Sequence, residues 1–331
     1  MYSIEMVGSE EKSTDDAVQL TALQTLREAV CHQAKCLPGA PDALHDPIRN
    51  AVAIELACYW EATAPKVGNV HPGAAFADCC YEDFCRAAKS IAPILAGADK
   101  IGGSIDGIGQ RVLRSIEATR KATAANVNLG IVLLIAPLAS ARDRGDIARV
   151  LSTIDRHQTE LVYRAIGLAA PGGVKPAEVD SQWDVTSKSK ASPARDHHAQ
   201  TESLDLIAAM RMSRERDRIA LQYSDDFLDF FETVVPLMAS EMAMKHEPGE
   251  AILRGQLKML AQRPDSLIAR KCGAEIAEEA QQRAAECFDV HGNLCPLAIQ
   301  AYDCWLRADG NRRNPGTTAD LIAAAIYWLI R

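Results

Sequence analysis

Apolar residues recur at helical spacing along most of the chain, and no stretch shows the strict alternation of apolar and polar residues that is typical of strands. The clearest example is the set Phe227, Phe230, Phe231, Val234 and Met238, whose spacing would place all five on one face of a helix. The pattern predicts a compact all-α protein of about ten helices with no sheet. We expect helices near residues 16–35, 47–62, 82–95, 108–121, 126–141, 146–169 (one or two), 249–262, 265–289, 294–308 and 316–331.

The same pattern suggests a simple domain organisation. Residues 1–15 are polar and acidic and read as a flexible tail, and residues 16–331 read as a single all-α domain. Within that domain residues 171–200 begin Pro-Gly-Gly, are rich in Ser, Lys, Asp and His, and have no apolar periodicity, so they predict a long loop.

Composition and charge narrow the function. The 331 residues are 48% apolar and carry a formal net charge of −8, which disfavours binding to nucleic acid or to anionic membranes. The longest apolar runs, residues 129–139 and 321–330, are too short to span a bilayer, and residues 1–16 do not resemble a secretory signal. None of the ten cysteines forms a CxxC pair, so we expect a cytoplasmic protein with reduced thiols and no structural metal site.

Two segments interrupt the helical pattern in the first half of the chain. In the first, Glu61, Lys66, Asn69 and His71 gather at a helix end and in the Pro/Gly-bounded loop that follows it. Such a loop can present a lysine to a phosphate and leave a carboxylate for acid–base work, although an ordinary helix end followed by a turn fits the composition as well. The second segment, Asn126 to Gly130, puts two amides ahead of a buried helix, where they could bind a ligand or cap the helix.

Two further segments lie in the second half. Between Met210 and Tyr223, Arg214 and Arg218 would share a helix face with Asp217 nearby, as a solvated ion-pair network or a triphosphate clamp, and Arg270 and Lys271 would lie near another helix start. Residues 314–321 read Asn-Pro-Gly-Thr-Thr-Ala-Asp-Leu. Thr317 and Asp320 fit a capping box, but a Gly/Thr-rich helix start is also an anion site, and its aspartate could serve Mg²⁺.

The sequence lacks the common nucleotide and hydrolase motifs. It has no GxxxxGK[ST] loop, no strand–GxGxxG–helix unit, no GxSxG elbow and no HExxH pair, and the glycines at 103–109 have no accompanying lysine. The usual kinase and hydrolase classes therefore lose support.

Taken in order, these segments resemble the triphosphoribosyl-dephospho-CoA synthase family, and the ending Asn-Pro-Gly-Thr-Thr-Ala-Asp-Leu is similar to its branch in archaea and bacteria that handle one-carbon units. One departure is visible, because the family's loop usually reads Pro-Lys-Pro-Gly and here Val67 stands for the second proline. The resembling stretches are 61–78 with Phe84, 126–137, 164–173, 208–223, 265–273 and 314–321.

The resemblance implies that ATP gives up adenine and that its triphosphoribosyl group joins the 2′-hydroxyl of 3′-dephospho-CoA. Mg²⁺ would accompany the nucleotide, no organic cofactor is implied, and a homodimer is left open. Substitution at an anomeric carbon needs cations on the triphosphate, a carboxylate near the developing positive charge, and an acid–base group. The implied catalytic candidates are Glu61, Asp78, Asp217 and His71; the candidate metal ligands are Asp78 and Asp320; and the candidate binding residues are Lys66, Gly68, Asn69, Asn126, Asn128, Arg216, Arg270, Lys271, Asn314, Gly316, Thr317 and Thr318.

Two other hypotheses remain at this point. A phosphoribosyl group could pass to a hydroxyl of another cofactor precursor, for example in the synthesis of a tetrahydromethanopterin-type one-carbon carrier. The protein could also be a non-catalytic helical scaffold, but polar residues at several helix starts would then serve no purpose.

Overall fold

The structure is a computed structural model that describes residues 45–99, 106–169, 205–244 and 247–331. In these ranges the chain forms helices and no strand, apart from two isolated bridges, so the all-α prediction is confirmed. The predicted tail at 1–15, the helix at 16–35 and the loop at 171–200 lie outside the described residues.

The helices are shorter and more numerous than the apolar pattern predicted. Residues 265–289 form two helices because Gly273, at φ 97°, ends one and begins the next. The described ranges contain fourteen α-helices: α2 (His45–Thr63), α3 (Tyr81–Ala96), α4 (Ile108–Ala122), α5 (Leu129–Ser140), α6 (Ile147–Ser152), α7 (Arg156–Ala169), α8 (Leu206–Ser213), α9 (Arg218–Ser224), α10 (Val235–Ala243), α11 (Pro248–Gln262), α12 (Ser266–Cys272), α13 (Ala274–Ala285), α14 (Pro296–Arg307) and α15 (Gly316–Ile330).

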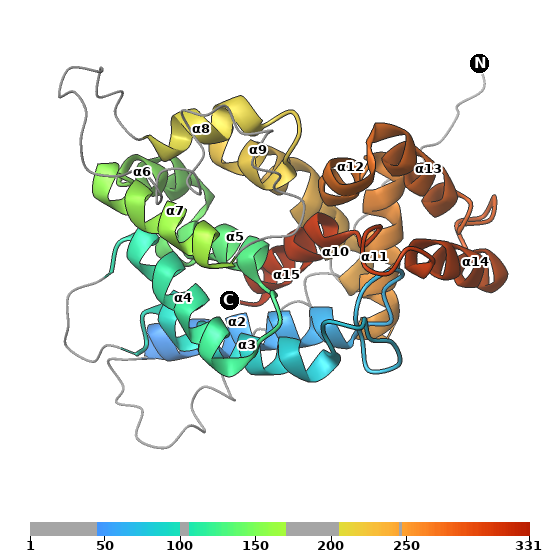
Figure 1. Ribbon diagram of the computed structural model, residues 1–331, viewed down its shortest axis with the longest axis horizontal. Coiled ribbons are helices and arrows are strands. Elements are labelled where there is room, and N and C mark those ends of the chain that lie inside the picture. The colour runs from blue at the N-terminus through green and yellow to red at the C-terminus, as the bar shows by residue number, and fades with distance from the viewer. Residues whose placement is uncertain (1–44, 100–105, 170–204, 245–246) are drawn as a thin grey trace, which may run out of the picture.

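The core is built around α5 and α15, the two helices with the most continuous apolar sequence. Residues 130–138 of α5 are all buried, and so is nearly all of α15 from residue 317 onward. Figure 1 shows α15 crossing the middle of the molecule, with α2 and α3 beneath it, α4 to α7 on one side, and α11 to α14 on the other. Helices that are apolar on every side belong in such a position, because no face of them favours water.

The phenylalanine-rich segment differs from the single α-helix that its spacing predicted. Asp226 and Phe227 have positive φ angles, and a short π-helix, η4 (Phe230–Val234), follows and continues into α10. All five predicted core side chains are nevertheless buried. The backbone therefore changes its helical geometry in this segment, and the five side chains stay in the core.

A second, smaller core holds α11 to α14 together. It includes Val67 from the loop after α2, together with Leu257, Ile268, Tyr302 and Leu306. Val67 thus joins the loop after α2 to α11–α14, whereas Ala64 at the start of the loop packs in the main core. No helix in the described part of the chain is long and apolar enough to cross a membrane.

Candidate functional site

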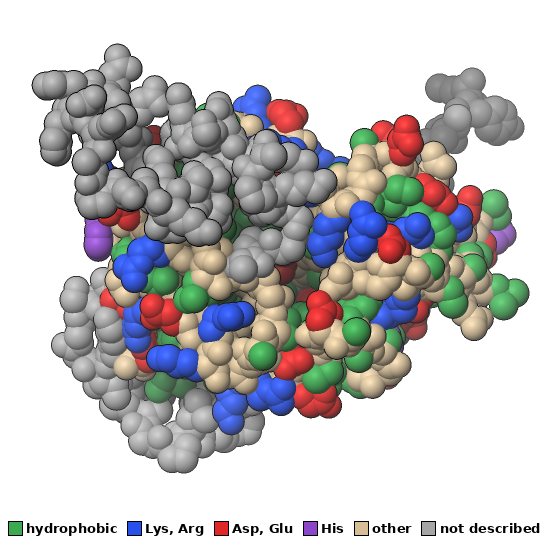
Figure 2. Space-filling view, in the orientation of Figure 1, with side chains coloured by type: hydrophobic (Ala, Val, Ile, Leu, Met, Phe, Trp, Pro, Cys, Tyr) green, Lys and Arg blue, Asp and Glu red, His purple; other side chains and the backbone are tan. Residues whose placement is uncertain are grey.

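The ends of five helices, α2, α5, α9, α12 and α15, meet at one place. The Ser266 hydroxyl at the start of α12 bonds the Thr317 hydroxyl at the start of α15 at 3.0 Å, and it accepts the Arg218 backbone N–H of α9 at 3.2 Å. Gly130 in the first turn of α5 lies directly against the Asp320 carboxyl of α15. Segments separated by up to about 250 residues in sequence therefore form one site. Figure 2 shows Lys and Arg side chains gathered on this face, near α12 and the start of α15.

The loop after α2 is held in place by a glutamine that the sequence analysis did not single out. Gln256 of α11 is fully buried; its Oε1 accepts the Val67 N–H at 2.9 Å, and its Nε2 donates to Val67 O at 2.9 Å and to Asn69 Oδ1 at 2.7 Å. Asn69 in turn donates to Asn314 Oδ1 at 2.6 Å. This relay joins α11, the loop and the start of α15.

The same contacts explain the departure from the family's Pro-Lys-Pro-Gly. A proline at position 67 has no N–H and could not donate to Gln256. Gly68 is at φ 65°, and a Cβ there would collide with Leu306 and Pro315, so this glycine is required by both conformation and space. Its N–H donates to Asp303 Oδ1 at 2.7 Å.

Glu61 and Lys66 form a buried ion pair at the inner side of this loop. Their Oε1 and Nζ atoms are 2.9 Å apart, and the residues are only 4% and 1% exposed. The Lys66 ammonium also donates to the Glu61 carbonyl. An unpaired charge would be very costly at this depth, so each residue fixes the other.

Asp320 is crowded by other acids. Loss of hydration, followed by the charges of Glu61, Asp265 and Asp217, raises the pKa of Asp320 well above its usual range. The Ile131 backbone N–H supplies a hydrogen bond that partly opposes this shift. Gly130 is the residue that makes room, because a Cβ there would overlap the Asp320 carboxyl.

Asp217 and Arg270 are paired across the gap between α9 and α12. Oδ1 of Asp217 caps α9 by accepting the Ile219 N–H at 2.8 Å, and its Oδ2 binds the Arg270 guanidinium. Arg270 and Lys271 lie in the last turn of α12, not near its start as the sequence suggested, and cations there interact favourably with the helix dipole. Loss of hydration lowers the pKa of Lys271.

Asp265 caps two helices with one carboxylate. Its Oδ1 accepts the Leu267 and Ile268 N–H groups of α12 at 2.8 and 3.1 Å, and its Oδ2 accepts the Thr318 N–H and hydroxyl of α15 at 2.8 and 2.7 Å. The predicted capping box of Thr317 and Asp320 is therefore wrong. The cap of α15 comes from Asp265 at the start of α12, and a Cβ at Gly316 would press on the end of the Leu267 side chain.

The remaining candidates lie around the edge of the site or away from it. Asn128 precedes α5 at φ 71°; it makes no side-chain cap, and among the described residues its buried Nδ2 has no hydrogen-bond partner. Asp78 is exposed and accepts from Asn311 at 2.7 Å; the Asn311 carbonyl accepts from Lys271 at 3.3 Å. Asn126 is exposed.

The single helix face expected for Arg214 and Arg218 does not form, because the helix breaks at residues 214–217. Arg214 is exposed beside Glu215, and Arg216 is exposed with Ser213 at 3.5 Å. Arg218 is buried and binds Asp229 at 2.9 and 3.2 Å. Arg214 and Arg218 therefore do not share a helix face.

His71 lies on the outer side of the loop. Loss of hydration, with the charges of Arg307 and Lys66, lowers the pKa of His71. Its Nδ1 accepts the Gly73 N–H at 3.1 Å.

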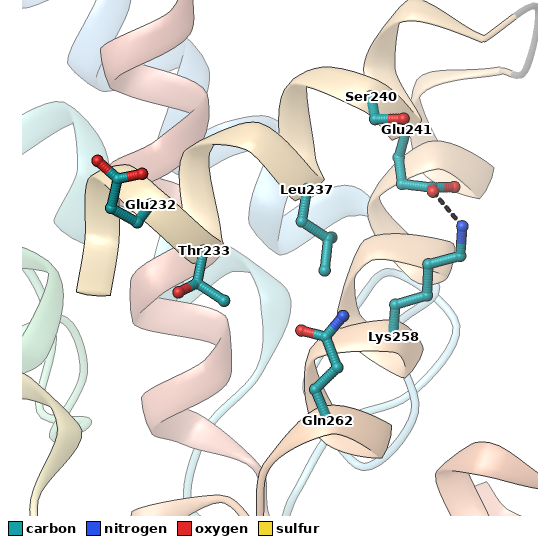
Figure 3. Close-up of a pocket in the computed structure, with 7 residues that line it drawn as sticks. All are labelled: Glu232, Thr233, Leu237, Ser240, Glu241, Lys258 and Gln262. Carbon is teal, nitrogen blue, oxygen red and sulfur yellow. Dashed lines mark hydrogen bonds and ion pairs between the residues drawn. The ribbon is translucent and has the colours of Figure 1, made fainter. Parts of the chain in front are cut away.

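A separate hollow between η4, α10 and α11 contains none of the predicted residues (Figure 3). Lys258 and Glu241, which line this hollow, form an ion pair with each other, with Nζ and Oε1 2.5 Å apart. Glu241 also binds Arg254 at 3.0 Å, so its charge is already balanced.

The described residues contain no cluster of three or more His, Cys, Asp or Glu side chains that could enclose a metal ion. Mg²⁺ in nucleotide sites commonly uses one or two carboxylates together with substrate phosphates. The surplus negative charge around Asp320 fits such a shared ion, whereas Asp78 lies beside Lys271.

The comparisons with known proteins identify the family of this chain. A family model described as CitG, ATP:dephospho-CoA triphosphoribosyl transferase, matches residues 48–330. The chain therefore belongs to this family and is a transferase. A solved structure of a candidate triphosphoribosyl-dephospho-CoA synthase from Archaeoglobus fulgidus has the same fold, with a TM-score of 0.52 and 22% identity over 73% of this chain and 96% of that one. No curated protein matches the chain.

Sequence reasoning missed several residues that position the site. Gln256 could have been noticed, because it interrupts the apolar stripe of α11 between Ile252 and Leu260. Asp265 is followed by an apolar helix and so has the pattern of a helix cap. Nothing in the local sequence marks Asp303, whose role depends on a contact 235 residues away.

Proposed function

We propose that this protein transfers the triphosphoribosyl group of ATP to the 2′-hydroxyl of 3′-dephospho-CoA and releases adenine. The bond between ribose C1′ and adenine N9 breaks, and a new bond forms between that carbon and the acceptor oxygen. The acceptor hydroxyl loses its proton, and adenine takes one up. The observation that carries the proposal is the crowded carboxyl of Asp320, next to Glu61 and Asp217, in a chain of this family.

In this mechanism Asp320 handles the proton. A carboxyl whose pKa is raised binds a proton more tightly, so it can take a proton from a hydroxyl and return it more effectively than an ordinary aspartate. Glu61 supplies negative charge close to the sugar carbon, where positive charge develops in the transition state. Lys66 holds Glu61 in position through the buried ion pair.

The phosphates are bound by Arg270 and Lys271. Asp217 fixes the Arg270 guanidinium on one side, which leaves its other N–H groups for phosphate oxygens. Lys271 adds a second cation beside it, and Asn128, whose buried amide is available, orients a sugar or phosphate oxygen. Mg²⁺ bound to the triphosphate would neutralise part of its charge, and Asp320 would be the carboxylate that holds the ion.

The test is incubation with ATP and dephospho-CoA. Adenine release that requires dephospho-CoA, with a product heavier by the triphosphoribosyl group, is the expected result. If ATP fails and a phosphoribosyl diphosphate donor with another acceptor turns over, the alternative transfer is correct. No adenine release and no nucleotide-induced stabilisation would favour the scaffold hypothesis.

A further inference from the structure

A groove of about 350 Å³ lies on the outer side of the loop that carries Lys66, between this loop and α14. Figure 1 shows the loop after α2 lying against α14. The wall is mixed in character: Val67, Leu294 and Ile299 are apolar, and His71, Gln300 and Asp303 are polar. The size is within the range of small-molecule sites.

The groove adjoins the candidate site because the same loop borders both. Val67 lines the groove, while its backbone N–H and C=O are held by Gln256, which also holds Asn69 of the site. Lys66, the residue before Val67, is near enough to His71 to influence its protonation. A ligand that reacts near Asp320 can therefore extend past the loop into the groove.

The described lining of the groove contains no Lys or Arg side chain, which disfavours a phosphate and favours a neutral ligand. Asp303 accepts the Gly68 N–H at 2.7 Å and the Arg307 Nε–H at 2.9 Å, so its negative charge is balanced from within the protein. Gln300 is exposed and offers both a donor and an acceptor. The wall thus suits a chain in which methyl and methylene groups alternate with amides.

We infer that this groove binds the pantetheine arm of the acceptor. The inference rests on the proposed function, because dephospho-CoA carries this arm on the 5′-diphosphate of the adenosine whose 2′-hydroxyl reacts. The arm has two amides, a hydroxyl and a dimethyl carbon, and it carries no charged group between the diphosphate and the terminal thiol. Its methyl and methylene groups match the apolar wall, and its amides match Gln300. Its lack of charge suits the end near Asp303, where the negative charge is already balanced.

Gln300→Trp tests the groove. This side chain is exposed, so a tryptophan should block the groove without disturbing the core, and Ala301→Trp on the same helix, also exposed but outside the groove, is the matched control. We expect Gln300→Trp to raise the KM for dephospho-CoA about tenfold or more, because several buried methylene groups are displaced. The KM for ATP should stay within about twofold, and Ala301→Trp should leave both values unchanged.

An equal rise in both KM values, or no change in either, would overturn the inference. Failure of the proposed function gives a different result, since wild-type protein would then release no adenine with dephospho-CoA. In that case calorimetry with pantetheine alone decides. Binding to wild type and to Ala301→Trp but not to Gln300→Trp supports the groove, and absence of binding to wild type rejects it.

Discussion

Replacing Asp320 with asparagine should make the protein more stable and inactive. The folded state raises the pKa of Asp320, so it favours the protonated carboxyl more than the unfolded chain does. As the pH rises above the ordinary value of 3.8, the unfolded chain loses this proton first, and the stability of the fold falls until the pH passes the folded pKa. Asparagine carries no charge and can still accept the Ile131 N–H, so it removes this cost.

The size of the gain follows from linkage. Each unit of pKa elevation corresponds to about 1.4 kcal/mol of stability lost at high pH. We expect Asp320→Asn to gain on the order of 1–3 kcal/mol at pH 8, and less at pH 5, which lies closer to the ordinary value of 3.8 above which the cost accumulates. For a protein of this size the gain raises the Tm by about 1–2 °C per kcal/mol. Thermal unfolding at the two pH values measures it, alongside adenine release.

Asp265→Asn is the control. Burial raises the pKa of Asp265 too, but its carboxylate accepts four hydrogen bonds, from Leu267, Ile268 and the N–H and hydroxyl of Thr318. An amide nitrogen cannot accept, so one helix start loses its cap, and we expect a loss of about 1–3 kcal/mol. If Asp320→Asn were destabilising, or if its gain were the same at both pH values, the electrostatic reasoning would be refuted.

Three further variants test other parts of the site. Gly130→Ala should lower kcat at least about tenfold while circular dichroism shows unchanged helix content, because the new Cβ displaces the Asp320 carboxyl; wild-type kcat would contradict this. Gln256→Leu should cost about 2–3 kcal/mol in chemical denaturation, since it leaves buried groups of Val67 and Asn69 unpaired, and an unchanged midpoint would argue against the relay. Arg270→Ala should raise the KM for ATP about tenfold by removing a charged hydrogen bond, and a rise confined to the acceptor KM would reassign this arginine.

The fold class was predictable because helical periodicity is a local property of the sequence. The bounds of α3, α4, α11 and α15 agree with the predicted ranges to within one or two residues. The predicted number of helices was too low because a helix can break without any change in the apolar pattern. Such breaks occur at Gly273 and at Asp217, the cap of α9. Periodicity records which side chains are buried, and it does not record such breaks.

The candidate site was predictable in part. Residues at helix ends, such as Lys66, Asn128 and Asp320, stood out because polar groups interrupt apolar runs there. Their partners could not be found in the same way, since the bond from Asn69 to Asn314 joins residues 245 positions apart. The arginines at 214 and 216 looked suitable by type, but only the geometry separates them from Arg270.

The double cap at Asp265 has a consequence for how this site can diverge. Because one carboxylate orients both α12 and α15, it keeps the acid on α15 aligned with the phosphate-binding groups on α12. The intervening segment, residues 274–307, contributes α14 and one wall of the groove. Changes at the groove-facing residues of this segment, such as Leu294 and Gln300, would alter which acceptor is admitted, whereas Asp303 must stay because it holds the loop of the reacting centre through the Gly68 N–H.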